Sequence, residues 1–131
     1  MGMDVADPRT VLAEIAREKS DYRITAQIVD AVGAGIPAAN LASLTLTLHL
    51  DDAAATLINS VDDANILNAG RGTVDSSGNL VLTLSSADNV IIDTTLTEEL
   101  HIALIEWTYN GGASQGRHQR AFRVRNLARV S

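Results

Sequence analysis

The sequence contains no cysteine and very few aromatic residues. Without cysteine the chain cannot form a disulfide, a thiolate nucleophile or a cysteine-based zinc site, so nothing in it requires an oxidising compartment. Phe, Trp and Tyr together make up only 3% of the residues, which leaves Leu, Ile, Val and Ala to build the interior. We therefore expect an aliphatic core with no aromatic cluster to mark a ligand pocket.

Basic residues are also scarce. Ten Lys and Arg stand against 16 Asp and Glu, which gives a formal net charge of −6. Because binding to a nucleic-acid backbone depends on Lys and Arg that neutralise phosphates, this balance argues against nucleic acid as a partner. Half of the basic residues lie close to the C-terminus, at Arg117, Arg120, Arg123, Arg125 and Arg129. We expect these arginines to pair with acidic residues on neighbouring strands.

Long apolar runs are absent as well. No stretch approaches the roughly 18 apolar residues of a membrane-spanning helix, and the N-terminus lacks the basic segment and apolar run of a signal peptide. We expect no membrane contact and synthesis in the cytoplasm. The length of 131 residues and the 46% hydrophobic content are typical of one folded domain with one core.

The first twenty residues show the spacing of a helix. Asp7 followed by Pro8 is a favourable helix start, because Asp accepts hydrogen bonds from free amides and Pro is tolerated in the first turn. Apolar residues then recur at helical spacing, at Val11, Leu12, Ile15 and Ala16. The pattern predicts a short α-helix from about Pro8 to about Lys19.

A helix of this length is marginal alone in water, so its apolar stripe needs a surface to pack on. We expect residues 1–20 to form a helical docking segment ahead of a β-domain over residues 21–131. Val11, Leu12 and Ile15 are the predicted partner-binding residues.

From Tyr22 onward the pattern changes to the two-residue alternation of β-strands. It predicts strands over 22–29 and 44–50, a hairpin from Val74 to Leu84 with a positive φ at Gly78, and a strand buried on both faces over 100–109. A terminal hairpin should follow at 117–130. Six or seven short strands with turns about every ten residues predict an all-β, immunoglobulin-like antiparallel sandwich, although the cysteine pair of antibody domains is missing.

Motifs for catalysis or metal binding are not recognisable. His101 follows Glu98 and Glu99, but polar groups near a strand start are ordinarily solvated. The acidic pairs do not have the spacing of a calcium-binding loop, and neither a nucleophile elbow nor a phosphate-binding loop occurs. We expect no enzymatic activity, no metal and no cofactor; the rival hypothesis of a small hydrolase would use His101 and the adjacent glutamates.

Several strand and turn segments together resemble small proteins of tailed bacteriophages and prophages. The resembling part spans about residues 22 to 130 and includes Ile24-Thr25-Ala26-Gln27, Gly35-Ile36-Pro37-Ala38-Ala39, Leu44-Thr45-Leu46-Thr47-Leu48, Ile58-Asn59-Ser60, Ile66-Leu67-Asn68-Ala69, Gly72-Thr73-Val74-Asp75, Ala87-Asp88-Asn89, His101-Ile102-Ala103-Leu104-Ile105-Glu106-Trp107-Thr108-Tyr109 and Arg125-Asn126-Leu127-Ala128-Arg129-Val130.

This resemblance implies a virion structural protein with an immunoglobulin-like sandwich, located at the head-tail junction, on the capsid surface or in the tail. Its expected partners are other virion proteins and further copies of itself. No catalytic residue is carried over. An alternative is a host-surface or glycan-binding immunoglobulin-like module displayed on the particle, for which Trp107 and Tyr109 are the candidate aromatic platform, although burial of Trp107 is the stronger expectation.

Overall fold

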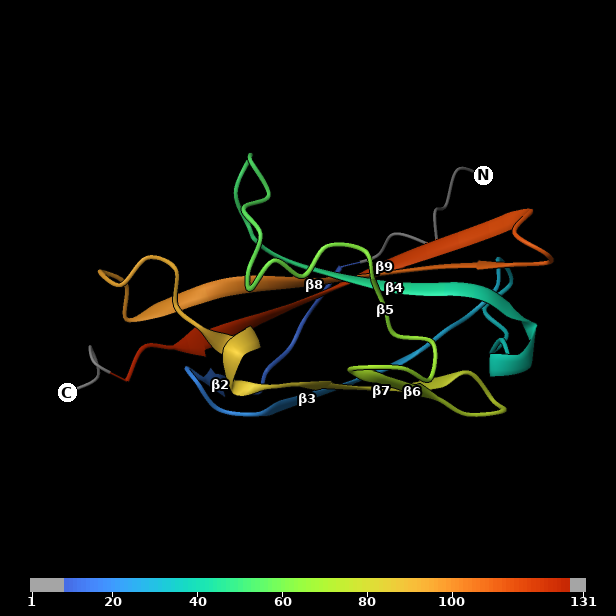
Figure 1. The fold of residues 1–131 in the computed structure, drawn as a ribbon, viewed down its shortest axis with the longest axis horizontal. Coiled ribbons are helices and arrows are strands. Elements are labelled where there is room, and N and C mark those ends of the chain that lie inside the picture. Colours follow the sequence, from blue (N-terminus) through green and yellow to red (C-terminus); the bar gives the residue numbers. More distant parts are fainter. Residues whose placement is uncertain (1–8, 128–131) are drawn as a thin grey trace.

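The computed structural model describes residues 9–127, which form two β-sheets lying one above the other (Figure 1). The larger sheet has the order β1-β9-β8-β4-β5, with β2 also paired to β9, and the smaller has the order β3-β7-β6. The strands are β1 (Arg9–Val11), β2 (Ala16–Arg17), β3 (Tyr22–Gln27), β4 (Leu41–Leu50), β5 (Ala64–Asn65), β6 (Gly72–Val74), β7 (Asn79–Leu84), β8 (Glu98–Tyr109) and β9 (Ser114–Arg125). The expected all-β class is confirmed.

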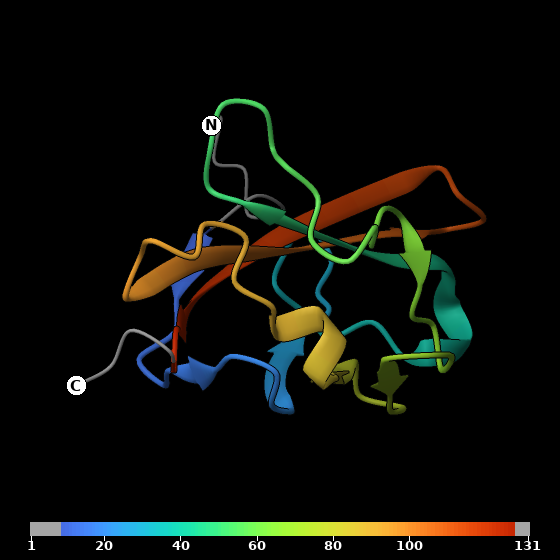
Figure 2. The same cartoon turned by 60° about the vertical axis from the view of Figure 1, so that its left-hand side comes forward.

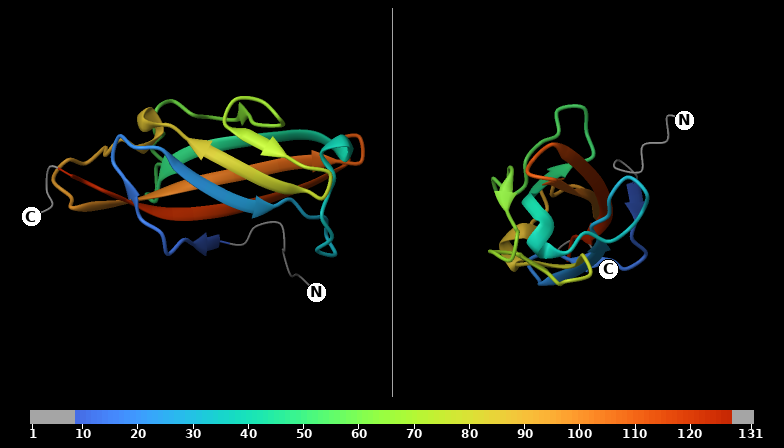
Figure 3. Two further views of the ribbon diagram at one scale, coloured as in Figure 1. Left: turned by 90° about the horizontal axis from the view of Figure 1, so that it is seen from below. Right: turned by 90° about the vertical axis from the view of Figure 1, so that its right-hand side faces the viewer.

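One aliphatic core lies between the two sheets, which enclose it when viewed along the strands (Figure 3). Alternate residues of each strand point inward, as the two-residue period predicted. The fully or almost fully buried side chains include Ile24, Leu44, Leu46, Leu48, Leu80, Leu82, Leu84, Ile105 and Phe122. Strand β8 lies between β4 and β9, so its central position is confirmed. On its second face Ile102 is fully buried but Leu100 and Leu104 are only half-buried, so the predicted two-sided burial holds at Ile102 alone.

The two predicted hairpins are present. In the β6–β7 hairpin Val74 pairs with Leu80, and Gly78 has the expected positive φ of 83°. The β8–β9 hairpin pairs all twelve residues of each strand. In it, a Cβ atom added at Gly116 would lie 2.6 Å from the Trp107 ring, so this position needs glycine because the indole packs directly on the backbone.

The N-terminal helix predicted from Pro8 to Lys19 is wrong. Asp7 and Pro8 lie outside the described residues, and the segment after them forms β1 and β2, which pair in parallel with β9 (Figure 3). A helix this short gains little from its own hydrogen bonds, whereas the edge of β9 supplies backbone partners. Arg9 adds side-chain bonds to Gln119 (2.9 Å) and Asp51 (3.2 Å). Tertiary pairing therefore overrides the helical spacing.

A buried ion pair joins the end of the smaller sheet to the loops around it. After β7 the chain forms the short 3-10 turn η2 (Ser86–Asn89; yellow coil in Figure 2), which places the carboxylate of Asp88 at 0% exposure. Arg71 donates two hydrogen bonds to it (2.7 and 2.8 Å), and Asn59 and the backbone of Ser85 donate one each (both 2.9 Å). Burial acts to raise the pKa of Asp88, but these donors outweigh it and lower the pKa.

Replacing Asp88 with Ala should destabilise the fold by about 2 to 4 kcal/mol, because Arg71, Asn59 and Ser85 would lose their shared acceptor. Urea denaturation followed by circular dichroism measures this difference. The matched control is Asp62→Ala, which removes an exposed loop carboxylate and should leave the midpoint within experimental scatter. Equal midpoints for the two variants would contradict the assigned role of Asp88.

Candidate functional site

The predicted partner-binding residues lie on the N-terminal edge of the larger sheet, but they do not form one stripe. Val11 in β1 is 60% exposed, whereas Leu12 packs against the core and Ile15 is half-buried. The N–H of Leu12 donates to the carbonyl of Ala121. Because alternate residues of an edge strand face the neighbouring strand, the N–H and C=O of Val11 point away from β9. Val11 thus combines an exposed apolar side chain with free backbone groups, and its role in partner binding stays a prediction.

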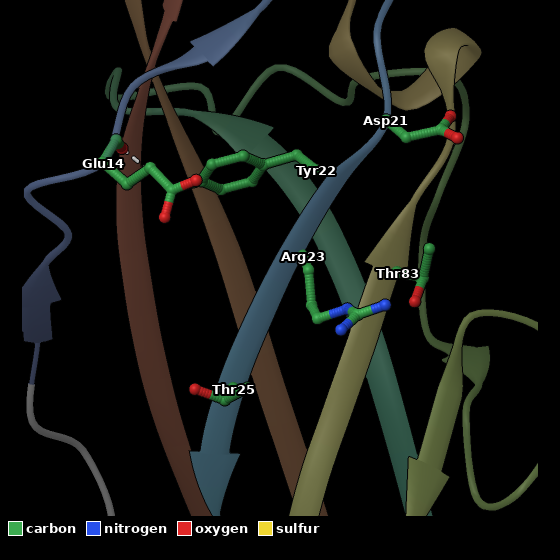
Figure 4. Close-up of a pocket in the computed structure, with 6 residues that line it drawn as sticks. All are labelled: Glu14, Asp21, Tyr22, Arg23, Thr25 and Thr83. Carbon is green, nitrogen blue, oxygen red and sulfur yellow. Dashed lines mark hydrogen bonds between the residues drawn. The ribbon is translucent and has the colours of Figure 1, made fainter.

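Beside this segment lies an open groove of about 560 Å³ at the edge of the smaller sheet (Figure 4). Its lining residues come from the segment before β2, from β3 and from β7: Glu14, Asp21, Tyr22, Arg23, Thr25 and Thr83. The Tyr22 hydroxyl donates to the Glu14 carbonyl (2.8 Å), and the Tyr22 ring stacks on Phe122 with centroids 5.1 Å apart. Tyr22 therefore fixes the N-terminal segment relative to β3. Burial and the nearby Glu14 charge raise the pKa of this tyrosine.

Three charged side chains line the groove, and within residues 9–127 none of them has an ion-pair partner. They are Glu14, Asp21 and Arg23. The backbone beside them is also available. The N–H of Ile28 donates to the carbonyl of Gly78, so the even-numbered residues of β3 direct their backbone groups toward β7. In an antiparallel ladder the residues between them face the other way, so the N–H and C=O groups of Arg23 and Thr25 point to the opposite edge of β3. The groove thus combines three charged side chains that have no ion-pair partner within residues 9–127 with backbone groups of β3 that face away from β7.

The expectation that the acidic and histidine side chains at the start of β8 are all solvated is wrong for two of them. His101 is fully buried, Glu99 is 4% exposed, and the Nε2 atom of His101 lies 2.7 Å from a Glu99 carboxylate oxygen. The same carboxylate accepts the backbone N–H groups of Ile92 (2.8 Å) and Asp93 (2.7 Å). The pair anchors the loop before β8 to the strand, and neither residue lines the groove.

Burial lowers the pKa of His101, and the opposing effect of the Glu99 hydrogen bond and charge does not compensate. Its Nδ1 atom has no hydrogen-bond partner. A proton added there would place a charged N–H in an apolar site beside Phe122, whose ring centroid lies 5.7 Å away. The neutral imidazole is therefore the form that fits the fold.

The C-terminal arginines differ in their surroundings. Arg125 pairs with Glu98 (3.0 Å) and Arg117 lies 3.9 Å from Glu106, so the predicted cross-strand pairing is confirmed for these two. Burial lowers the pKa of Arg120, which lies on the inward side of β9 with Phe122 and Val124. Arg129 lies outside the described residues. Among the described arginines, Arg117 and Arg125 thus have acidic neighbours on β8 and Arg120 faces inward.

Trp107 is 3% exposed and its indole N–H donates to the Val29 carbonyl (3.2 Å), while Tyr109 is half-buried. Burial of Trp107 is confirmed, so the two rings do not form an exposed aromatic platform.

Across residues 9–127, no three His, Asp or Glu side chains are arranged to hold a metal ion, and no helix is long and apolar enough to cross a membrane. No protein-family model matches the chain, and a search of curated proteins finds no significant relative.

The buried imidazole predicts a pH dependence of stability. In the unfolded chain His101 takes up a proton near pH 6.5, while the folded chain resists protonation because the pKa is lowered. The unfolded state then binds more protons below pH 6.5, so the stability contribution is present above this pH and is lost as the pH falls.

Urea midpoints of the wild type should therefore fall between pH 7.5 and pH 5. The variant His101→Gln, which keeps an N–H donor for Glu99 but does not titrate, should show a smaller fall. A control variant, His49→Gln, changes a half-buried histidine on the outer face of β4 and should follow the wild type. Identical pH profiles for all three proteins would contradict the assignment.

Proposed function

We propose that the two sheets are an immunoglobulin-like sandwich. In the lettering of that fold, β3-β7-β6 has the order B-E-D and β5-β4-β8-β9 has the order C′-C-F-G. This agreement in strand order supports the sequence-based expectation. The first strands depart from the constant-type order, in which strand A lies beside B, because β1 and β2 pair with β9. The edge of β3 is consequently free.

We further propose that the protein is a non-enzymatic structural component of a tailed-phage particle, where it makes contacts with other virion proteins. The resemblance of residues 22–130 to small phage proteins suggests the setting. The distribution of polar groups supports a contact role over a catalytic one. The deeply buried side chains of Asp88, Glu99 and His101 form hydrogen bonds that hold loops and strands together. The charged side chains that line the groove face outward.

The observation that carries the proposed contact role is Val11, an apolar side chain 60% exposed on an edge strand with outward-facing backbone groups. An edge strand with outward-facing backbone groups offers hydrogen bonds to another chain, and an apolar side chain beside them adds contact area. Deletion of residues 1–20 is a poor test, because it would remove β1, β2 and the buried Ala16. A point substitution on the surface separates binding from folding.

The variant Val11→Asp should keep the thermal stability of the wild type and lose most of its incorporation into phage particles, by about tenfold or more, because a charge would be buried in the contact. The measurement is quantitative mass spectrometry of particles purified from cells that express each tagged protein. Val32→Asp is the matched control, since Val32 is 87% exposed in a turn away from β1. Normal incorporation of Val11→Asp would reject this contact, and absence of the wild type from particles would reject the virion role.

A further inference from the structure

The outer face of the larger sheet is rich in arginine. Phe122 and Val124 point into the core, so the odd-numbered side chains of β9 point outward, and the strand register places their partners on the same face. The outward-facing charged residues of the sheet's strands are two glutamates, Glu98 and Glu106, and five arginines: Arg9, Arg17, Arg117, Arg123 and Arg125. This face is therefore positively charged in a chain whose formal net charge is −6.

Two of these arginines are left without a counter-charge. Carboxylate partners are present for the other three, Arg9, Arg117 and Arg125. Arg17 and Arg123 form no ion pair within residues 9–127. The carboxylate of Glu18, next to Arg17, instead accepts the N–H of Leu127 (2.9 Å). Arg17 also lies directly opposite Arg125, an arrangement of like charges that destabilises a sheet.

Apolar surface borders these two free cations. Val11 pairs with Ala121, which precedes Arg123 by two residues on the same face of β9, so the contact proposed at Val11 continues directly to Arg123. Leu100 lies opposite Arg123 and is half-buried. Leu127, just after the end of β9, is 50% exposed. The outer face thus combines exposed apolar side chains with guanidinium groups that have no partner within the described chain.

We propose that this face binds an acidic segment of another virion protein, whose carboxylates pair with Arg17 and Arg123 while its apolar side chains cover Val11 and Leu100. The inference rests on the contact function proposed above and deepens it, because it states the chemistry of the partner. A guanidinium group binds a carboxylate through two parallel hydrogen bonds, which makes arginine well suited to ion pairs at an interface. A segment with Asp or Glu next to apolar residues therefore matches this surface.

Charge also disfavours two other occupants. A nucleic acid extends beyond two arginines and would meet the rest of an acidic chain, where its phosphates are repelled. A two-fold dimer through this face would bring two positively charged surfaces together, because the same patch meets itself in such a contact. An acidic partner brings the charge of opposite sign that both of these lack.

Charge reversal on this face tests the proposal through incorporation into phage particles. Arg17→Glu and Arg123→Glu should each reduce incorporation by about tenfold or more, because a carboxylate of the partner would then face a like charge. Circular dichroism should show both variants folded, and Arg17→Glu should not lower the thermal midpoint, since it removes the like charge opposite Arg125. The variant Arg123→Lys keeps the charge and should retain most of the incorporation.

The matched control is Gln115→Glu. It adds a negative charge on the outer face of the same strand, about 26 Å along β9 from Arg123, and should be incorporated like the wild type.

Arg123→Lys also allows the partner to be identified, because a carbodiimide couples an amine to a carboxylate that it contacts. Mass spectrometry of treated particles should find the new amine joined to Asp or Glu of another virion protein. The proposal is overturned if both charge reversals are incorporated normally, if the only intermolecular products join copies of this chain, if no product with another virion protein forms, or if nuclease releases the wild type. Absence of the wild type from particles rejects the virion role as well, whereas normal incorporation of both reversals rejects the acidic partner alone.

Discussion

The structure depends on the hairpin of β8 and β9, which supplies most of the hydrogen-bonding partners of the larger sheet. Its two strands pair along their whole length, and β4 on one side and β1 with β2 on the other complete their ladders. The outer edge of β9 would leave backbone groups without partners, whereas a helix of twelve residues is only marginally stable by itself. The N-terminal segment is therefore extended and pairs with β9. Within the hairpin, Gly116 has no side chain and so leaves room for the indole of Trp107.

Buried charge has a structural role in two places. Asp88 is satisfied by donors from three separate segments, and Glu99 is satisfied by His101 and two loop amides. In each case one carboxylate accepts several hydrogen bonds from irregular segments of the chain. These bonds fix the loops around the sheets in a protein that has few aromatic residues to pack against them. Asp88, Glu99 and His101 thus take part in structural hydrogen bonds, whereas Glu14, Asp21 and Arg23 lie exposed beside β3.

The contact proposed at Val11 arises from a departure in strand pairing. Because β1 and β2 pair with β9, Val11 becomes an exposed apolar residue on one sheet and β3 keeps a free edge on the other.

Several features could be predicted from the sequence because they depend on local patterns. Alternating leucines fixed the inward face of β4, Gly78 required its positive φ in a tight turn, and the apolar residues of 100–109 predicted a central strand. The helix prediction failed because the helical spacing of Val11, Leu12 and Ile15 covers too few residues to outweigh pairing with the edge of β9. The partners of Asp88 and Glu99 were also invisible, since Arg71 and His101 reach them only after folding. Sequence by itself determined the inward faces of the regular strands, through the alternation of side chains. The tertiary structure decided strand neighbours, charge pairs and the burial of Glu99 and His101, because hydrogen bonds between distant segments exist only when the sheets are assembled.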